Sequence, residues 1–319
     1  MTPFGMTGEL TPRVLAFTLF GAMSPAAILL RWYDKHGRDL PWRKTRNAYP
    51  ILVSEVMLQQ TQVLRVILYY HRWLERFPSW RELAQATNAD VIALWSGLGY
   101  NRRGLMLRDI ARRIVEDGEP TTEEGWRTLK GIGPYTAAAI TSFSLHKRTL
   151  PIDTNIRRVG ARLFLGIPFP DLKDDERIRQ AAESFLPHKG RFYDIPQALF
   201  DLASLVCTKT PACAICPMKK FCPSAEAFLS GQVTIPKQSI KKTFEMRHRD
   251  KPHPDRIYRG RILKLVQEKG AILVKDIGSL IDPSFDEEHD TAWLLRILDR
   301  MRKDQFIERR GEKITIYKK

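Results

Sequence analysis

The sequence has no apolar run long enough to cross a bilayer as a helix. The apolar stretch nearest its start, Val14–Met23, is too short, and neither a basic segment nor a small-residue cleavage site frames it. We therefore expect no signal peptide, no membrane partner and a cytoplasmic protein. An amphipathic segment begins directly after Met23, so we expect the natural start at this methionine and treat residues 1–24 as an extension that need not be native.

Cysteine is absent from most of the chain, because all four fall within sixteen positions, at Cys207, Cys213, Cys216 and Cys222. A disulfide framework would spread its cysteines through a small secreted chain, so this clustering indicates a metal site in a reducing compartment. Four thiolates spaced C-x5-C-x2-C-x5-C on one short segment suit a [4Fe–4S] cluster. Structural zinc is the second interpretation, because it generally uses two C-x2-C pairs and only Cys213 and Cys216 form one here.

Acidic residues are few relative to basic ones, 36 against 52, which gives the chain of 319 residues a net charge of +16. This excess favours a polyanionic partner, nucleic acid first and an anionic membrane surface second. Residues 229–255 form a predicted basic linker, since the segment from Lys237 to Arg261 holds nine Lys or Arg against three Asp or Glu. A solvated tether explains the same composition.

Alternating strand patterns are absent between Ala26 and Ala225, where apolar residues instead recur at helical spacing. Helix breakers such as Phe77-Pro78 and Gly118-Glu119-Pro120 separate the helical segments. This part of the chain is therefore predicted to be mainly α. The clearest helical windows are Leu83–Ala93, Gly104–Glu116, Tyr135–Phe143, Asn155–Phe164, Asp174–Phe185 and Ile195–Val206.

The end of the chain has a different pattern. Three helical segments, Ile257–Lys269, Val274–Ile281 and Thr291–Lys303, precede two alternating segments, Phe306–Arg310 and Lys313–Tyr317, which predict a hairpin. Three helices followed by a hairpin resemble a winged helix. Such modules usually bind DNA through the third helix, and a sizeable minority mediate protein contacts.

A short turn, Gly131-Ile132-Gly133, joins two helical segments within the α-helical part. Two glycines around an apolar residue allow a tight turn whose amides face outward at the start of the next helix, where phosphate oxygens bind well. Ile132 would fix the turn to the core. Taken alone, this pattern also fits an ordinary connection between two helices.

The segment Leu129–Ala137 resembles the helix-hairpin-helix of the endonuclease III and MutY superfamily of base-excision DNA glycosylases. In that family a catalytic Asp lies eighteen residues beyond the position after the hairpin, and Asp153 lies eighteen residues beyond Tyr135. The segment SEVMLQQTQV at residues 54–63 is nearly the signature of MutY-type adenine glycosylases. The resemblance covers roughly residues 26 to 225.

The resemblance implies a fold of two lobes. A six-helix barrel with the helix-hairpin-helix is expected at residues 47–153. An iron–sulfur cluster domain is expected from residues 25–46 together with 154–228, and the winged-helix-like α+β domain at 256–319. The family has six residues in the first cysteine gap, and this chain has one fewer. The cluster would be structural and present Lys209, Lys219 and Lys220 to DNA.

The resemblance also assigns catalytic roles. Glu55, surrounded by apolar residues, would be the acid that protonates the base, and burial would raise its pKa. Asp153, at the start of a helix, would stabilise positive charge on the sugar. Asn155 would contact Asp153 or the DNA. Bifunctional relatives carry Lys where this chain has Tyr135, and a tyrosine cannot form a Schiff base, so hydrolysis without strand cleavage is expected.

The remaining predicted site residues contact DNA or the base. Trp95–Tyr100 resembles a further MutY-family loop that lines the base pocket, and taken alone it also fits a plain glycine-rich turn. A solvated basic helix face accounts equally well for Arg157 and Arg158. By resemblance, the DNA-binding set is Gln59, Gln60, Gln62, Tyr100, Gly131, Ile132, Gly133 and Arg157.

These observations predict a monofunctional DNA glycosylase, acting as a monomer at the nucleoid of a prokaryote on double-stranded DNA with a mismatched or damaged base. By resemblance the base is adenine opposite guanine or 8-oxoguanine. A thymine or uracil mismatch glycosylase is the near alternative, since related enzymes share the hairpin, the tyrosine and the cluster. The winged-helix pattern replaces the Nudix-like domain of typical MutY proteins, which leaves recognition of 8-oxoguanine open. A non-catalytic DNA-binding protein is the alternative from another class.

Overall fold

A computed structural model describes residues 23–236, 245 and 247–317. The extension before Met23, with most of the apolar stretch that begins at Val14, and part of the predicted linker lie outside the described residues. None of the helices in the described ranges has the length and apolar character needed to cross a membrane.

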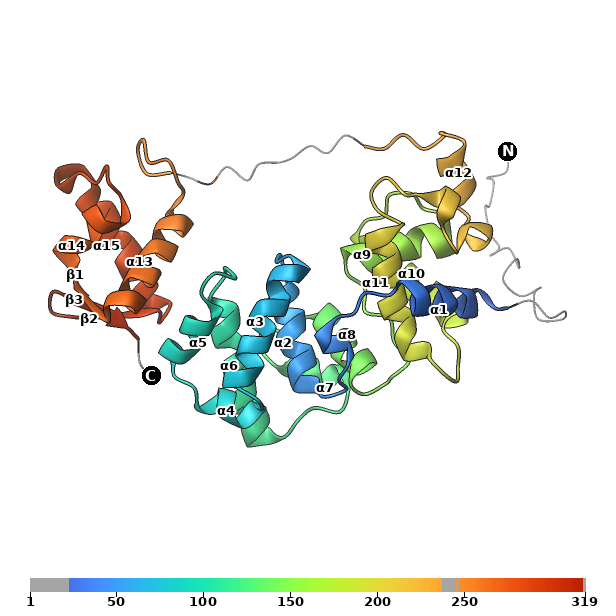
Figure 1. Cartoon of the computed structure of the whole chain (residues 1–319), viewed down its shortest axis with the longest axis horizontal. Coiled ribbons are helices and arrows are strands. Elements are labelled where there is room, and N and C mark those ends of the chain that lie inside the picture. The colour runs from blue at the N-terminus through green and yellow to red at the C-terminus, as the bar shows by residue number, and fades with distance from the viewer. Residues whose placement is uncertain (1–22, 237–244, 246, 318–319) are drawn as a thin grey trace, which may run out of the picture. The chain divides into compact units, whose positions relative to one another are not determined.

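The chain is mainly helical (Figure 1), and its residues form two compact units. The first unit consists of the described residues up to Asp39 together with His146–Pro236, and the second contains Leu40–Leu145 and the C-terminal region. The helices of the first unit are α1 (Pro25–His36), α9 (Thr154–Gly160), α10 (Asp175–Phe185), α11 (Ile195–Leu205) and α12 (Ala225–Leu229). The second unit begins with α2 (Ala48–Leu58), α3 (Val63–Arg76), α4 (Trp80–Gln85), α5 (Asn88–Trp95), α6 (Arg102–Asp117), α7 (Glu123–Thr128) and α8 (Pro134–Phe143).

The first unit is organised around helix α11. Helices α1 and α9 both pack on α11, and their apolar faces bury Leu29, Ile156 and Leu199 completely. Arg38, just after α1, donates through Nε to the buried carboxylate of Asp201 on α11 at 2.7 Å. A buried charge is stable only when it is paired in this way. The segment after α1 is thereby tied to the core of this unit.

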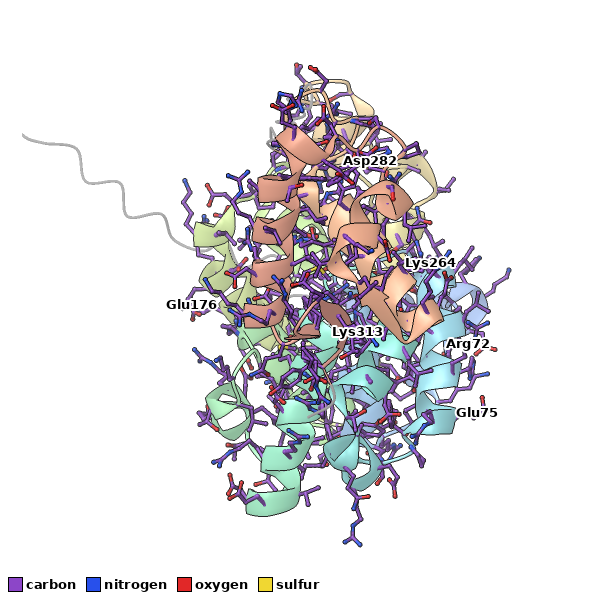
Figure 2. The ribbon with its side chains drawn as sticks, turned by 90° about the vertical axis from the view of Figure 1, so that its left-hand side faces the viewer. Arg72, Glu75, Glu176, Lys264, Asp282 and Lys313 are labelled. Carbon is purple, nitrogen blue, oxygen red and sulfur yellow. The ribbon has the colours of Figure 1, made fainter. Side chains whose placement is uncertain are left out.

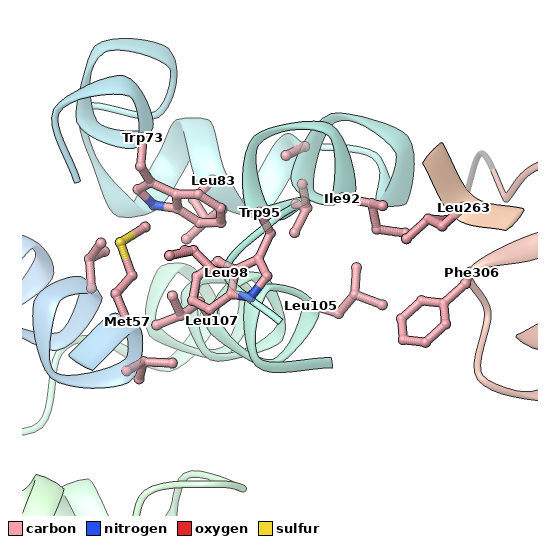
Figure 3. Packing of buried hydrophobic residues seen from close by; sticks show 14 of the residues in the cluster. Met57, Trp73, Leu83, Ile92, Trp95, Leu98, Leu105, Leu107, Leu263 and Phe306 are labelled. Atoms are coloured by element: carbon pink, nitrogen blue, oxygen red, sulfur yellow. The ribbon is translucent and has the colours of Figure 1, made fainter. Parts of the chain in front are cut away.

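Helix α2 runs through the core of the second unit. All ten residues from Ala48 to Met57 are buried, and the side chain of Asn47 caps the helix by accepting from the amide of Tyr49. Met57 of α2 packs with Trp73 of α3 and Trp95 of α5, and the two indole rings lie edge to face at 5.4 Å (Figure 3). A helix that is apolar on every side is expected to be enclosed by its neighbours.

One helical prediction was wrong. The window Leu83–Ala93 is divided between α4, which ends at Gln85, and α5, which begins at Asn88. Thr87 accepts from the amide of Asp90, and the Asp90 carboxylate accepts from the amide of Thr87, so a capping box starts a new helix there. The other helical windows of the α-helical part are confirmed, although the ordinary helix α9 ends at Gly160 and continues as a π-helical turn, Ala161–Leu165.

The C-terminal region is a small α+β domain. Its elements follow the order α13 (Asp255–Lys269), β1 (Ala271–Leu273), α14 (Val274–Ile281), α15 (Glu287–Lys303), β2 (Ile307–Arg310) and β3 (Lys313–Ile316). The predicted hairpin of β2 and β3 is confirmed, and β1 pairs antiparallel with β3 to give the sheet order β1-β3-β2. Strand β1 was missed because its three residues are too few to show alternation. Helix α15 begins at Glu287, before the predicted Thr291, because Asp286 caps it.

A buried ion network joins the end of the predicted linker to this domain. The Lys251 ammonium contacts the carboxylates of Asp282 and Asp290, and all three side chains are buried. The ring of His248 stacks on Trp293 and contacts Asp290. Lysines at other positions, such as Lys264 and Lys313, are exposed on the surface of the domain (Figure 2).

Candidate active site

The turn between α7 and α8 is tight, as its sequence predicts. Gly131 has a φ of +97°, a conformation that side chains rarely adopt, and a Cβ there would lie 2.1 Å from Sδ of Met106. Ile132 is 6% exposed, and its amide donates to the carbonyl of Leu129 at 3.0 Å. The conformation at position 131 thus favours glycine, a side chain there would also displace Met106, and Ile132 fixes the turn to the core as predicted.

Helix α8 begins directly after this turn. Gly133 is its N-cap residue, and Pro134 occupies the first helical position, where the missing N–H of proline is not needed. Amides in the first turn of a helix have no partner within the helix and carry the positive end of its dipole. The arrangement is therefore suited to an anion such as a phosphate oxygen.

The same turn brings Tyr135 to Glu55. Tyr135 is the second residue of α8, and its hydroxyl donates to Oε2 of Glu55 at 2.7 Å. Glu55 lies on the buried helix α2 and is only 7% exposed. Two residues that are 80 positions apart in the sequence thus form one hydrogen-bonded pair. Glu55 is therefore buried and is not a solvent-exposed residue of an amphipathic helix.

Asp153 lies in the first unit, where it caps helix α9. Its Oδ1 accepts from the amides of Asn155 and Ile156, at 2.8 and 2.7 Å, and Oδ2 accepts from Nδ2 of Asn155 at 2.8 Å. The predicted contact between Asn155 and Asp153 is present. The carboxylate is half-buried and lies at the positive end of a helix, where negative charge is stabilised.

The two arginines after Asp153 are held within the first unit. Arg157 forms a bidentate pair with Asp175, with Nε–Oδ1 and Nη2–Oδ2 distances of 2.5 and 2.7 Å, and this pair raises the pKa of Arg157. Arg158 donates to the backbone carbonyls of Ala203 and Cys207. The guanidinium of Arg157 therefore ties α9 to α10, and a contact with DNA would compete with that pair.

The three predicted glutamines lie in the connection between the end of α2 and the start of α3. Gln59, Gln60 and Gln62 are all exposed, and Gln60 has a φ of +56°. Tyr100 is 67% exposed and has a φ of +50°. An exposed, non-glycine residue in the left-handed region is uncommon and marks a strained position of the kind found at ligand sites.

Two arginines of the site escaped the sequence analysis. Arg103 donates to the backbone carbonyls of Val56, before the glutamines, and of Gly99, before Tyr100. Arg162 lies beside the cysteines. Arg162 is 2% exposed and its guanidinium lies 4.7 Å from the ring centroid of Phe228. Neither has a distinct sequence signal, because each lies in a segment with other arginines and binds backbone carbonyls.

The four cysteines are free thiols that line one small pocket, together with Arg162 and Phe228. Burial raises the pKa of Cys216 to about 11 and that of Cys222 to about 12. Arg162 donates to Sγ of Cys207 at 3.5 Å. Four thiols around one pocket are a suitable donor set for an iron–sulfur cluster. Among the described residues, however, no three Cys, His, Asp or Glu side chains are grouped as ligands of a single metal ion.

Comparisons with known proteins find a family model and relatives that cover the site residues. A family model described as "HhH-GPD superfamily base excision DNA repair protein" matches residues 53–188, which contain Glu55, Tyr135 and Asp153. The chain is 33% identical over 292 residues to an adenine DNA glycosylase of Mycolicibacterium smegmatis, covering 89% of this chain and 92% of that protein.

Two further relatives cover less of the chain. An adenine DNA glycosylase of Mus musculus is 39% identical over 220 residues, covering 65% of this chain and 42% of that protein. The chain thus spans less than half the length of the mammalian relatives that it matches. The solved structure of a thermostable thymine-DNA glycosylase has a TM-score of 0.58 at 26% identity, covering 63% of this chain and 94% of that one.

Proposed function

Because the chain belongs to the HhH-GPD superfamily of base excision DNA repair proteins, we propose that it is a monofunctional DNA glycosylase that removes adenine opposite guanine or 8-oxoguanine. The observation that carries this proposal is the buried carboxyl group of Glu55 with the Tyr135 hydroxyl bound to it. The choice of adenine is supported by the adenine DNA glycosylases among the relatives.

The proposed reaction divides its work between two carboxyl groups. Glu55, as the carboxylic acid, gives its proton to the adenine ring, so that the bond between C1′ and the base nitrogen breaks and the base leaves uncharged. The carboxylate of Asp153 stabilises the positive charge that develops at C1′. Water then adds to C1′ and passes its proton to a carboxylate. The products are free adenine and an abasic sugar.

Tyr135 limits the reaction to hydrolysis. Its phenol has no amine with which to form a Schiff base, and its hydroxyl is directed to Glu55. We propose that this hydrogen bond orients the Glu55 carboxyl group toward the base. Borohydride treatment of the enzyme with its substrate DNA should therefore trap no covalent adduct, and an efficient adduct would contradict the assignment.

We propose that duplex DNA is held by the turn before α8 and by the exposed residues near α2. The first-turn amides of α8, with Gly131 and Gly133, would bind phosphate oxygens. Gln59, Gln60 and Tyr100 would enter the duplex beside the extruded base, which is easiest to flip where the pair is a mismatch.

We also propose a [4Fe–4S] cluster bound by the four cysteines. This is supported by their convergence on one pocket and by the softness of four thiolate ligands. The cluster would fix the loop that carries Lys219 and Lys220 for contact with DNA. A purified protein that is brown, absorbs near ~400 nm and loses that band in a Cys216→Ser variant would support the cluster. Stoichiometric zinc without iron would contradict it.

The C-terminal domain has the element order of a winged helix, and we propose that it adds a second DNA contact. Glu287 and Glu288 at the start of α15 disfavour the insertion of that end into DNA. Arg296 and Arg300 are exposed on its second half and make no ion pair with any residue that the structure describes. Replacing both with Gln should weaken DNA binding. The slope of the logarithm of the binding constant against the logarithm of salt concentration should fall by the equivalent of up to about two phosphate contacts. Lys264→Gln, on the exposed face of α13, serves as the control.

A second candidate function is the removal of thymine opposite guanine, which the likeness to a thymine-DNA glycosylase supports. The two functions are separated by incubating the full protein with duplexes that carry A·8-oxoG, A·G, T·G, U·G or hypoxanthine. We expect release of adenine from the first two. Release of thymine or uracil alone would favour the second candidate, and no release from any duplex would favour a DNA-binding protein without catalysis.

A further inference from the structure

Arg103, near the start of α6, is bound to two separate backbone segments. Its Nη1 donates to the carbonyls of Val56 and Gln59, at 2.9 and 2.5 Å, at the end of α2. Its Nη2 donates to the carbonyl of Gly99 at 3.1 Å, with a longer contact to Leu98 at 3.4 Å. One planar guanidinium therefore spans the end of the helix that carries Glu55 and the loop between α5 and α6.

Each of these segments ends in a strained residue. Gln60 directly follows Gln59 and has a φ of +56°, and Tyr100 directly follows Gly99 and has a φ of +50°. Such conformations persist only where the surrounding structure holds them. The carbonyl just before each strained residue accepts from Arg103. The guanidinium thus binds the backbone directly before two residues that have unfavourable backbone conformations.

The loop that ends in Tyr100 has other attachments. Tyr69 donates to the carbonyl of Ser96 at 2.9 Å, and Nε1 of Trp95 donates to the carbonyl of Gly99 at 3.0 Å. Gly97 has a φ of +101°, and a Cβ there would lie 2.2 Å from the Tyr69 hydroxyl oxygen. These contacts fix the loop to α3 and α5. Arg103 joins this loop to the end of α2.

One of the three guanidinium nitrogens of Arg103 makes no hydrogen bond with the described residues. Its Nε is buried and has no hydrogen-bond partner among the described residues. The guanidinium also lies over the rings of Trp95 and Tyr100, with its central carbon 5.5 Å from each ring centroid. A buried donor without a partner is unfavourable. Arg103 keeps this position while its other two guanidinium nitrogens bind both backbone segments.

We propose that Arg103 is a positioning residue that holds Gln59, Gln60 and Tyr100 as one rigid wedge for opening the mismatched pair. This inference rests on the proposed glycosylase function. Lysine has a single ammonium group and lacks the planar fork that reaches both carbonyls at once. In an Arg103→Lys variant the wedge would lose its fixed geometry, while Glu55 and Tyr135 would keep theirs.

The test compares Arg103→Lys with Arg113→Lys, the same change at an exposed position of α6. Single-turnover adenine release from an A·8-oxoG duplex should be about 10²-fold slower for Arg103→Lys and unchanged for Arg113→Lys. The second readout is the fluorescence of 2-aminopurine placed beside the adenine, which rises when the stack opens. In a Glu55→Gln background, which binds without chemistry, Arg103→Lys should reduce this rise and Arg113→Lys should not.

Three results separate the inference from the function on which it rests. If the wild-type protein releases no base from any duplex, the proposed function fails. If it does release adenine, but Arg103→Lys equals Arg113→Lys, the inference is overturned. Slower release with an unchanged fluorescence rise also overturns it, since the wedge would then be intact.

Hydrogen exchange of the wild-type protein keeps the inference testable if the Lys variant does not fold. Amides at Gln60 and Thr61 should exchange together with those at Gly99 and Tyr100, because one side chain holds both segments. Clearly different opening rates for the two segments would overturn the proposal.

Discussion

We assign catalytic roles to two carboxyl groups, those of Glu55 and Asp153. They differ in burial and in the hydrogen-bond donors around them. Glu55 lies within the buried helix α2, is 7% exposed and accepts from the hydroxyl of Tyr135. Asp153 is half-buried at the start of α9 and accepts three N–H bonds from Asn155 and Ile156. An apolar helix interior suits a carboxyl group that carries a proton, and a ring of N–H donors suits one that carries charge.

The local structure around each carboxyl group therefore sets the role that we propose for it. The same chemical group becomes an acid or a charge stabiliser according to which element it occupies. Glu55 owes its surroundings to the complete burial of α2, and Asp153 owes its donors to its position as an N-cap. Each prediction below changes one side of this contrast and leaves the other intact.

The largest effect is expected for Glu55→Gln. The amide keeps the size of the side chain and an oxygen for the Tyr135 hydroxyl, but it has no acidic proton to give. Adenine release should fall by about 10³-fold or more in single-turnover assays, with DNA affinity nearly unchanged. The control is Glu75→Gln on the exposed face of α3 (Figure 2). A Glu55→Gln rate within tenfold of the wild type would remove Glu55 from the role of acid.

Asp153→Asn should slow release on the order of 10²-fold, because the cation at C1′ loses a full negative charge while the helix keeps a good N-cap. Asp286 provides a matched control, since it caps α15 by accepting from the amides of Glu288 and His289. Asp286→Asn should leave the rate unchanged. Equal rates for the two variants would show that Asp153 acts only as a cap.

Tyr135→Phe tests the contact that joins the hairpin to Glu55. Removing the hydroxyl leaves Glu55 without this donor, and a loss of about 1.4 kcal/mol corresponds to a rate about tenfold lower. Tyr317→Phe, at the end of the C-terminal domain, is the control. The rate should be measured from bound substrate, so that a change in orientation is separated from a change in affinity. A rate equal to that of the wild type would show that Glu55 is oriented without Tyr135.

The smallest effect separates the structural role of Asp153 from its chemical role. Asp153→Ala removes the cap of α9 and should lower the free energy of unfolding by about 0.5–2 kcal/mol, whereas Asp153→Asn should change it little. Urea denaturation of the two variants measures the difference. Asp286→Ala should show a similar loss with normal catalysis. If both Asp153 variants were as stable as the wild type, the capping contacts would contribute nothing measurable.

Much of the fold follows from local sequence signals. Helical spacing predicts α6, α8 and α11, and the pair of glycines around Ile132 predicts the turn before α8. The division between α4 and α5 was missed because a capping box at Thr87 overrides an apolar pattern that continues through it. Strand β1 has only three residues and depends on its pairing with β3, which no local pattern reveals.

The candidate site was predictable only in part. The resemblance to the helix-hairpin-helix glycosylases implied Glu55, through the motif at residues 54–63, and Asp153, through its interval of eighteen residues from Tyr135. The hydrogen bond between Tyr135 and Glu55 joins segments 80 positions apart and follows from tertiary packing alone. Arg103 was missed for the same reason, because its partners are backbone carbonyls, which have no sequence signal.

The central claim is that Glu55 protonates an adenine and releases it by hydrolysis. The most direct test is chromatographic detection of the free base from an A·8-oxoG duplex, with the wild-type, Glu55→Gln and Glu75→Gln proteins at equal concentration. We predict adenine from the wild type and from Glu75→Gln, release slower by about 10³-fold or more from Glu55→Gln, and an intact abasic strand. Adenine released at wild-type rates by Glu55→Gln would contradict the claim.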